Sequence, residues 1–323
     1  MMDLTVSIIN TNNRELLGGC LESIFTNSSG ISLEVYVIDN NSHDGSVEMV
    51  SSRFPQVKVI KNDRIDGFAA NHNKVLHRSQ GRYVCILNED TLICPHAFER
   101  MIAFMDQHPD VGAIGPQILH KDGGGVQLEC ARKFPTLFTE FCRNTGLTKL
   151  LPKSRIFGGV LMGYWDHNDT REVDCLSGAC MIVRTSAMKE IGLLDERFFM
   201  YSEDDDWLYR LKKGGWRVFF LHRAHILHYG GQANMRQPRR MGVEAFKSRY
   251  IFFQKHRGNL YAWIYRLFIF FITLAKLLAF SVGLLVGKDP QRRGRYQEKI
   301  TSHNCVLKWV LAGELPHSQG PRG

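Results

Sequence analysis

The sequence lacks the short motifs that mark several large classes of protein. None of its eight cysteines forms a Cys-x-x-Cys pair, and several fall inside apolar runs, so we expect reduced, buried thiols rather than a disulfide or zinc framework. Neither a Gly-x-Gly-x-x-Gly fingerprint after the first apolar run nor a Gly-x-x-x-x-Gly-Lys-Ser/Thr loop occurs. These absences argue against a dinucleotide oxidoreductase and a P-loop enzyme. The reduced cysteines predict a cytoplasmic protein, and we expect no signal peptide because the N-terminus has no basic segment followed by an apolar one.

Acidic residues are scarce in the last quarter of the chain. From Arg239 onward there are 15 Lys and Arg against 4 Asp and Glu, whereas the first 238 residues carry 26 against 28, so the tail accounts for the formal charge of +9. A basic, partly apolar tail on a nearly neutral body favours contact with anionic lipid. A nucleic-acid site would interleave base-stacking aromatics with its charges, so we expect no nucleic-acid partner.

One short stretch organises the rest of the chain. Tyr83 to Leu87 is an apolar run typical of a buried strand, and it leads into Asn88-Glu89-Asp90. Because extended residues two apart point the same way, Asn88 and Asp90 can face one ligand while Glu89 points elsewhere. Their oxygens suit Mg or Mn, which in turn suits a diphosphate. The alternative is a strand followed by a polar helix cap, with Pro95 opening the next helix.

Strand-like and helix-like patterns alternate through the first half. Helical spacing of apolar residues follows the first strand and recurs after Gly67 and Pro95. Alternation of this kind predicts an α/β fold with a mostly parallel, doubly wound sheet, whose ligands bind beyond the carboxyl ends of the strands. The predicted strands are Leu4–Ile9, Leu33–Ile38, Val57–Ile60, Tyr83–Leu87 and Val111–Ile118.

Asp39 is the second candidate site residue. It ends the second predicted strand, where an acid can accept hydrogen bonds from a nucleoside. The alternative is that Asp39-Asn40-Asn41-Ser42 forms only a turn and a helix cap. Further along, Lys121 to Gly125 predicts a hairpin turn, or less simply a phosphate cradle, and residues 138–167 are either a loop over the site or a surface excursion.

An unusual run of acids lies in the second half. Residues 175–183 predict a buried strand broken by Ser177 and Gly178, as occurs where a ligand approaches the backbone closely. Ser202 can cap a following helix whose first turn holds Glu203, Asp204, Asp205 and Asp206. The helix dipole explains one or two of these acids. Four in a row repel one another, so we expect some of them to have a chemical role.

Taken together, these residues resemble the family 2 glycosyltransferases, in particular their rhamnosyltransferase-type branch. Six motifs occur in the family's order and span about residues 4 to 231. One motif alone is weak evidence, and six in order are strong. The motifs are Val6–Asn13, Val37–Ser46, Gly67–Asn73, Leu87–Thr91, Leu176–Ala179 and Phe198–Asp204.

The resemblance implies a Rossmann-like nucleotide-diphospho-sugar transferase fold of the GT-A type and an inverting, metal-dependent enzyme of the hexosyltransferase class. It implies that Asp204 is the general base, that Ser177, Gly178 and Glu203 lie on the acceptor side, and that Asp90 and His228 hold Mn or Mg, with His228 favoured over His225. Asn88 stands where the family has an acid, so the metal loses one carboxylate, and Asp205 and Asp206 leave open which acid is the base. The implied donor-binding residues are Thr11, Asn12, Asp39, Asn41, Asn73, Asn88 and Asp90.

A long apolar run occupies the tail. Residues 260–287 are interrupted only by Arg266 and Lys276, which are ten apart and therefore near one helix face. We expect a helix lying in the membrane interface with both charges toward headgroups, and the alternatives are a spanning helix and a soluble helix buried on the body. The predicted organisation is a catalytic domain at 1–238, a membrane-associating helical tail at 239–315 with its membrane surface at 260–295, and a disordered end at 316–323.

The sequence therefore predicts a transferase that moves a sugar, with rhamnose a candidate, from a nucleoside-diphosphate donor to a cell-envelope or polyprenyl-linked glycan. We expect it at the inner face of the cell membrane, either peripheral or anchored by its tail. One alternative is a catalytically silent, membrane-tethered sugar-nucleotide binder, against which the intact Asp90 and Asp204 argue. The other is a sugar nucleotidyltransferase, which would usually carry a glycine-rich loop after the first strand, and Asn10 to Arg14 contains no glycine.

Overall fold

The computed structural model describes residues 2–122, 124–230, 238–287 and 289–313. The chain divides into two compact units, the first formed by Met1–Phe199 with Glu203–Gly230 and the second by Met200–Ser202 with Gly231–Gly323. Gly123 of the predicted hairpin and the predicted disordered end at 316–323 lie outside the described residues.

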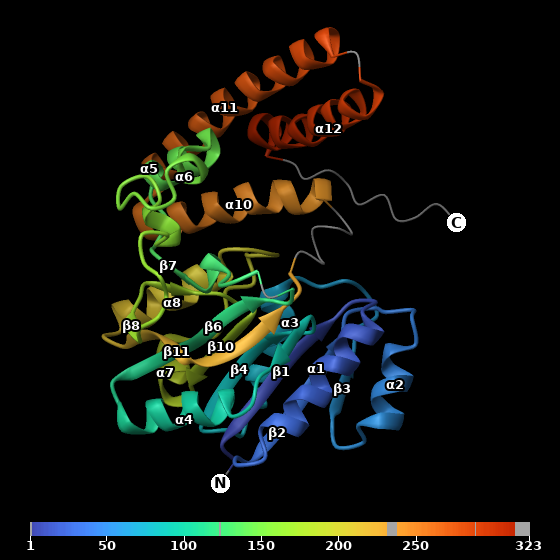
Figure 1. The fold of residues 1–323 in the computed structure, drawn as a ribbon, viewed down its shortest axis with the longest axis vertical. Coiled ribbons are helices and arrows are strands. Elements are labelled where there is room, and N and C mark those ends of the chain that lie inside the picture. Colours follow the sequence, from blue (N-terminus) through green and yellow to red (C-terminus); the bar gives the residue numbers. More distant parts are fainter. Residues whose placement is uncertain (1, 123, 231–237, 288, 314–323) are drawn as a thin grey trace. The chain divides into compact units, whose positions relative to one another are not determined.

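The first unit is built on a nine-stranded sheet (Figure 1). Its strands follow the order β3-β2-β1-β4-β10-β6-β11-β5, with β8 paired to β11. The first four are parallel, whereas β10 runs antiparallel to both of its neighbours. The strands are β1 (Leu4–Asn10), β2 (Leu33–Asp39), β3 (Lys58–Lys61), β4 (Tyr83–Asn88), β5 (Thr91–Ile93), β6 (Val111–His120), β8 (Arg171–Glu172), β10 (Cys180–Arg184) and β11 (Arg217–His228). A separate pair is formed by β7 (Ala131–Arg132) and β9 (Cys175–Leu176).

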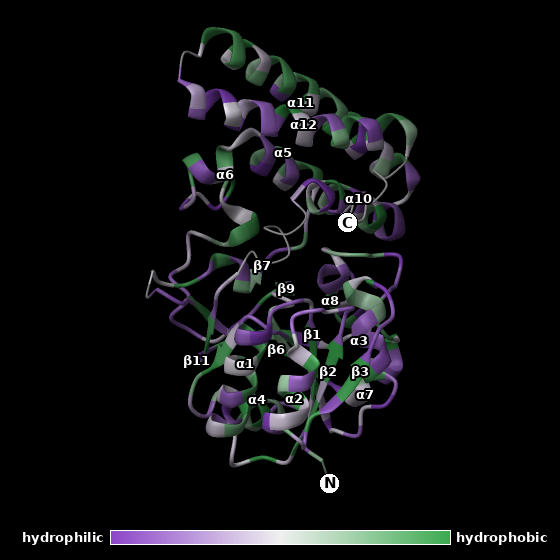
Figure 2. Ribbon diagram, turned by 90° about the vertical axis from the view of Figure 1, so that its right-hand side faces the viewer, coloured by the Kyte–Doolittle hydropathy of each residue, from purple (hydrophilic) through white to green (hydrophobic). Residues whose placement is uncertain are grey.

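Helices cover both faces of this sheet, which confirms the predicted doubly wound α/β class. α1, α2 and α4 lie on one face and α3, α7 and α8 on the other (Figures 1 and 2). The central strands β4 and β10 are buried on both sides, which explains why their sequences are nearly continuous apolar runs. The helices are α1 (Arg14–Asn27), α2 (Ser46–Arg53), α3 (Phe68–Leu76), α4 (Ala97–Gln107), α7 (Thr185–Ile191) and α8 (Glu203–Lys213).

The strand order reverses between β1 and β4. The chain winds outward from β1 through β2 to β3 and then returns to place β4 on the other side of β1. The loops that follow β1 and β4 therefore diverge, and open α/β sheets bind ligands at such a point, beyond the carboxyl ends of the strands. Because β10 is antiparallel to β4, the turn that precedes β10 reaches this same edge.

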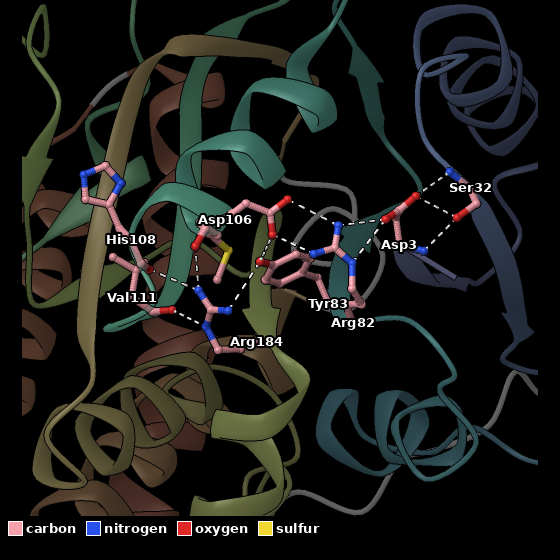
Figure 3. A network of polar contacts seen from close by, with 9 residues as sticks. Asp3, Ser32, Arg82, Tyr83, Asp106, His108, Val111 and Arg184 are labelled. Atoms are coloured by element: carbon pink, nitrogen blue, oxygen red, sulfur yellow. Dashed lines mark hydrogen bonds and ion pairs between the residues drawn. The ribbon is translucent and has the colours of Figure 1, made fainter. Parts of the chain in front are cut away.

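The opposite edge of the sheet is fastened by an arginine network (Figure 3). Arg82 donates to the carboxylates of Asp3 and Asp106, and the Tyr83 hydroxyl also donates to Asp106. Arg184 donates to the main-chain carbonyls of His108, Val111 and Met105. These bonds join the strands at the edge of the sheet opposite to the predicted site residues.

Three local expectations change. Residues 138–167 are not a simple loop, because Thr136 begins α5 (Leu137–Thr145) with a capping box and α6 (Leu147–Leu150) follows. After β6 the N–H of His120 donates to the Gly125 carbonyl, as in a hairpin, but Val126 makes only an isolated bridge to Leu119 and a 3₁₀ turn follows at Leu128–Cys130. Ser202 does not cap α8: its φ is 63°, outside the extended region of N-caps, and its buried hydroxyl has no hydrogen-bond partner among the described residues.

The second unit is helical. α10 (Pro238–Arg257), α11 (Asn259–Val286) and α12 (Pro290–Ala312) pack on one another. Among the described residues, α11 is the one helix long and apolar enough to cross a membrane, and Figure 2 shows its hydrophobic character along its length. Arg266 does not point outward as expected, because it donates to the carbonyls of Val310 and Trp309 in the last turn of α12.

Candidate active site

The loops after β1 and β2 form the first part of the site. The Ser42 hydroxyl accepts hydrogen bonds from the Asn10 amide and from the main-chain N–H of Asn12, at 3.1 and 2.9 Å. Asp39, which is 4% exposed, accepts from the Asn10 amide and from the Ser42 N–H. The predicted turn from Asp39 to Ser42 is therefore present, whereas the helix cap is not, because the N-cap of α2 is Gly45. The turn leaves each carboxylate oxygen of Asp39 a further lone pair.

Left-handed backbone shapes the same loops. Asn12 has φ 51° and Asn41 has φ 62°, a conformation that asparagine tolerates better than most residues. The Asn12 side chain accepts from the N–H of His43, which fixes the first loop against the second. The structure therefore brings Thr11, Asn12, Asp39 and Asn41 together in two joined loops.

Asn73 lies apart from these residues. Its amide nitrogen donates to the Leu194 carbonyl and to Glu196, both at 2.9 Å, and its amide oxygen accepts from the Leu194 N–H. The side chain is buried in α3. Its position suits it to hold the segment that leads to α8 rather than to contact a donor.

Asn88, Asp90 and His228 form the second part of the site. Asp90 Oδ1 lies 3.2 Å from His228 Nε2, and the two side chains are 4% and 13% exposed. Asn88 Nδ2 lies 3.5 Å from the same imidazole nitrogen. Glu89 points elsewhere and accepts from Asn13, as the alternation of an extended chain predicts. The N–H of Gly230 donates to Asp90 Oδ2.

Gln127 sets the orientation of the His228 ring. The Gln127 amide nitrogen donates to the His228 carbonyl at 2.8 Å, so the Gln127 oxygen is the atom that faces His228 Nδ1 at 2.9 Å. Nδ1 must therefore carry a proton, which leaves the lone pair of Nε2 directed at Asp90. The Nε2 lone pair and Asp90 Oδ1 therefore face the same point, an arrangement in which both atoms could hold a divalent cation.

Asp204 and Arg132 form the third part. Arg132 Nη2 lies 2.8 Å from Asp204 Oδ2 and 3.1 Å from Asp205 Oδ1. Asp204 also accepts from the main-chain N–H groups of Gly178 and Asp205. Burial alone would lower the pKa of Arg132, but the carboxylates of Asp205 and Asp204 more than offset this and raise its pKa above the usual range. Three donors therefore fix the position of the Asp204 carboxylate.

The four acids at the start of α8 have different surroundings. Asp206 is fully buried and accepts from Arg210 at 2.9 Å, four residues later on the helix. Glu203 is buried, and desolvation together with the neighbouring Asp204 raises its pKa well above the usual range, so its protonated form is favoured. Asp205 is 1% exposed and Asp204 is 13% exposed. Of the four, Asp204 has the most exposed side chain.

The turn before β10 links the second and third parts. The Asn88 N–H donates to the Ala179 carbonyl at 3.0 Å, and the Gly178 N–H donates to Asp204. The Ser177 hydroxyl accepts from the Ala179 N–H and holds the turn closed. Residues predicted for the metal, the acceptor side and the base therefore lie along one edge of the sheet.

Sequence reasoning missed three residues of this site. Asn10, Gln127 and Arg132 orient Asp39, His228 and Asp204 respectively. The sequence does hold a signal for Asn10, since it is the polar residue that ends the first strand. Gln127 and Arg132 follow a glycine-rich turn with no local signal.

Comparison with known proteins identifies the family of this chain. Residues 5–192 match the model of glycosyl transferase family 2. The chain is 28% identical over 254 residues to N-acetylglucosaminyl-diphospho-decaprenol L-rhamnosyltransferase of Mycobacterium tuberculosis, an alignment that covers 70% of this chain and 76% of that protein.

Solved structures share the fold at low identity. The mannosyltransferase PcManGT of Pyrobaculum calidifontis, in complex with GDP-Man and Mn²⁺, has a TM-score of 0.56 at 15% identity and matches 95% of this chain and 87% of that chain. S. aureus TarS 1-349 in complex with UDP-GlcNAc has a TM-score of 0.53 at 15% identity and matches 96% and 73%. These likenesses confirm the predicted GT-A type of fold.

Proposed function

The chain belongs to glycosyl transferase family 2, and we propose that it is an inverting hexosyltransferase that moves rhamnose from a nucleoside-diphosphate donor to a polyprenyl-linked glycan. The choice of sugar and acceptor is supported by the similarity to a rhamnosyltransferase whose name includes a diphospho-decaprenol acceptor. The neighbouring structures contain GDP-Man and UDP-GlcNAc, which supports a sugar nucleotide as donor.

The observation that carries this proposal is the separation of two charged centres along one sheet edge. The Asp90 and His228 pair lies beside Asn88, and Asp204 lies beyond the turn that Asn88 contacts. In the proposed reaction the first centre holds the diphosphate of the donor, while Thr11, Asn12, Asp39 and Asn41 hold the nucleoside. The second centre receives the acceptor.

Asp204 is the proposed general base. It accepts the proton of the acceptor hydroxyl as that oxygen attacks the anomeric carbon, and the nucleoside diphosphate leaves from the opposite face, which inverts the configuration. Arg132 and the main-chain N–H groups of Gly178 and Asp205 hold this carboxylate in one orientation. Arg132 keeps the carboxylate in place and compensates part of the charge that Asp204 and Asp205 bring into a buried turn.

Asp90 and His228 are the proposed ligands of a divalent cation. The buried carboxylate oxygen and the imidazole lone pair that Gln127 directs toward it fit such an ion. No group of three or more His, Cys, Asp or Glu residues gathers within the described ranges, so water and donor phosphates would complete the coordination, as is usual for Mg²⁺. When bound, the cation offsets the negative charge of the leaving diphosphate.

The test is nucleotide release by the full-length protein. UDP-, GDP- and dTDP-sugars are each supplied with Mn²⁺ or Mg²⁺, with and without a polyprenyl-linked glycan. We expect release from one donor, its loss with EDTA, and a fall of about 10²- to 10⁴-fold in transfer for Asp204→Asn. Asp63→Asn, an exposed acid outside the site, is the matched control. Donor binding without turnover, even with acceptor, would instead identify a silent sugar-nucleotide binder.

We also propose that the second unit associates with the inner face of the cell membrane. α11 leaves large apolar side chains exposed at helical spacing, and α12 exposes Arg292, Arg293, Arg295 and Lys299. Exposed apolar area beside basic residues supports binding at an anionic lipid surface. The exposed apolar residues of α11 are Leu260, Trp263, Ile264, Leu267, Phe271, Leu278, Val282, Leu285 and Val286.

Flotation of the full-length protein with lipid vesicles tests this association. Replacing Leu267, Phe271 and Leu278 together by serine should lower the fraction of the protein that floats with the vesicles. Ile65→Ser, an exposed apolar residue of the first unit, should not. Unchanged flotation of the triple variant would remove α11 from the proposed membrane surface.

A further inference from the structure

The exposed hydrophobic side chains of the first unit gather in one place. Within the part of this unit that the structure describes, six large hydrophobic residues are exposed, and five of them fall between residues 138 and 156. The sixth is Ile65. The five are Phe138 (47% exposed), Phe141 (44%), Leu150 (74%), Leu151 (43%) and Ile156 (63%). We call residues 133–157, which contain α5 and α6, the α5–α6 segment.

Positive charge surrounds these apolar side chains. The α5–α6 segment contains five Lys and Arg residues, all exposed, and a single acid, Glu140, which is buried. The rest of the first unit has more acids than bases, so the segment differs in sign from the unit that carries it. The five cations are Lys133, Arg143, Lys149, Lys153 and Arg155.

The segment is folded rather than irregular. α5 begins with the Thr136 capping box, and the buried Thr148 donates to the Phe157 carbonyl at 2.9 Å. The rings of Phe138 and Phe157 lie 6.3 Å apart. Exposed aromatic and aliphatic groups are therefore displayed on an ordered scaffold, and their exposure is not the result of a missing fold.

The chain connects this segment directly to the acceptor side of the site. Arg132, which contacts Asp204, is the residue immediately before it. The N–H of Lys133 donates to the Val160 carbonyl, which closes the base of the segment, and the β7 strand beside it pairs with β9, which leads to Ser177. A membrane or partner bound to the α5–α6 segment would therefore lie near Asp204, the proposed base.

We propose that the α5–α6 segment is a membrane-docking surface of the catalytic unit, which rests on an anionic lipid bilayer and so presents Asp204 to a lipid-linked acceptor. Exposed aromatic and aliphatic groups ringed by cations, with no exposed acid, match the boundary between acyl chains and anionic headgroups. A protein interface would be depleted in lysine. The link to an acceptor rests on the proposed transferase function, whereas the docking itself does not.

The experiment is hydrogen–deuterium exchange of the full-length protein with vesicles that contain phosphatidylglycerol or only phosphatidylcholine. The α5–α6 amides are read separately from those of α11 and α12, so the tail cannot mimic the result. We expect slower exchange across 137–156 with phosphatidylglycerol alone, and loss of this protection in Lys149→Glu/Lys153→Glu and in Phe138→Ser/Ile156→Ser. Arg78→Glu/Lys189→Glu, which reverses two exposed cations elsewhere in the unit, is the control.

A kinetic arm separates this proposal from the transferase proposal. Lys149→Glu/Lys153→Glu should lower kcat/KM for an acceptor embedded in vesicles about tenfold or more, and leave donor hydrolysis in vesicle-free buffer unchanged. A wild-type protein without turnover would overturn the transferase proposal, while the exchange result still decides docking. Docking is overturned if the α5–α6 amides gain no protection, or gain the same protection on phosphatidylcholine.

Discussion

Arg132 Nη2 lies 2.8 Å from Oδ2 of Asp204, although the two residues are 72 positions apart in the chain. The same guanidinium lies 3.1 Å from Asp205, so one buried cation faces two carboxylates at the start of α8. Arg132 belongs to β7, a two-residue strand that the sequence pattern does not predict. Its partner Asp204 is the acid that the family resemblance implies is the general base.

Arg132→Gln should strongly destabilise the protein. Removing one partner of a buried ion pair leaves its carboxylates uncompensated, so the free energy of unfolding should fall by about 3–5 kcal/mol. Chemical denaturation of the first unit measures this. Arg132→Gln/Asp205→Asn should recover part of the loss, because the two residues interact directly. If Arg132→Gln unfolds at the wild-type denaturant concentration, the ion pair has no structural role.

Asparagine substitutions at the three aspartates of α8 should give different results. Asp204→Asn should lower transfer by about 10²- to 10⁴-fold and cost less stability than Asp206→Asn, because Arg132 keeps Asp205 as a partner. Asp206→Asn should lower stability by about 3 kcal/mol, because Arg210, which also donates to the Ile191 and Leu193 carbonyls, loses its partner. Transfer rate per folded molecule and denaturation midpoint are measured for each. Equal loss of transfer in Asp205→Asn, at unchanged stability, would move the base to Asp205.

Gln127→Leu should weaken the response to metal ion. Loss of the Nδ1 contact frees the His228 ring to rotate, and such supporting contacts are typically worth about 10- to 100-fold in metal affinity. The Mn²⁺ concentration that gives half-maximal nucleotide release should therefore rise by this factor, while the donor KM at saturating Mn²⁺ changes less. Gln107→Leu, at an exposed position, is the control. An unchanged Mn²⁺ requirement would remove His228 from the proposed ligand set.

His72 should make the protein sensitive to mild acid. It is fully buried with Nδ1 2.7 Å from the Ser7 hydroxyl, and burial lowers its pKa to about 3 from the ordinary 6.5. Between these pKa values the unfolded state binds a proton that the folded state does not, so stability falls as pH drops below 6.5. The slope is at most about 1.4 kcal/mol per pH unit.

His72→Asn should reduce that slope by up to one proton, and His77→Asn, at an exposed position, should not. Urea denaturation at pH 7, 6 and 5 gives the comparison. Parallel pH profiles for His72→Asn and the wild type would show that His72 is not the group that titrates.

Gly67→Ala should disturb the segment that leads into α8. A Cβ at Gly67 would lie 2.8 Å from the Phe199 carbonyl oxygen and 2.9 Å from its Cα, closer than such atoms approach. The N–H of Phe68 donates to that same carbonyl. We expect a loss of about 1–3 kcal/mol in stability, together with slower transfer. Gly159→Ala, where a Cβ meets nothing within 4 Å, should match the wild type in both measurements.

The sequence alone determined the elements whose signal is local. Short segments rich in β-forming residues predicted β1, β2 and β4, and the polar residues at their ends predicted the edge that carries Asp39 and Asp90. The period of an extended chain correctly separated Glu89 from Asn88 and Asp90. The family was also recognisable, since its motifs are short and occur in order.

The tertiary structure alone decided which distant side chains meet. Gln127 and His228 are 101 positions apart, and nothing near either residue predicts their contact, which depends on the pairing of β6 with β11. The direction of Arg266 depended on where α12 ends, and the two helices within residues 138–167 depended on a threonine cap and a glycine break that the uneven apolar pattern obscured. Local periodicity records how one segment meets solvent and core, whereas a contact between segments arises only when the whole sheet is assembled.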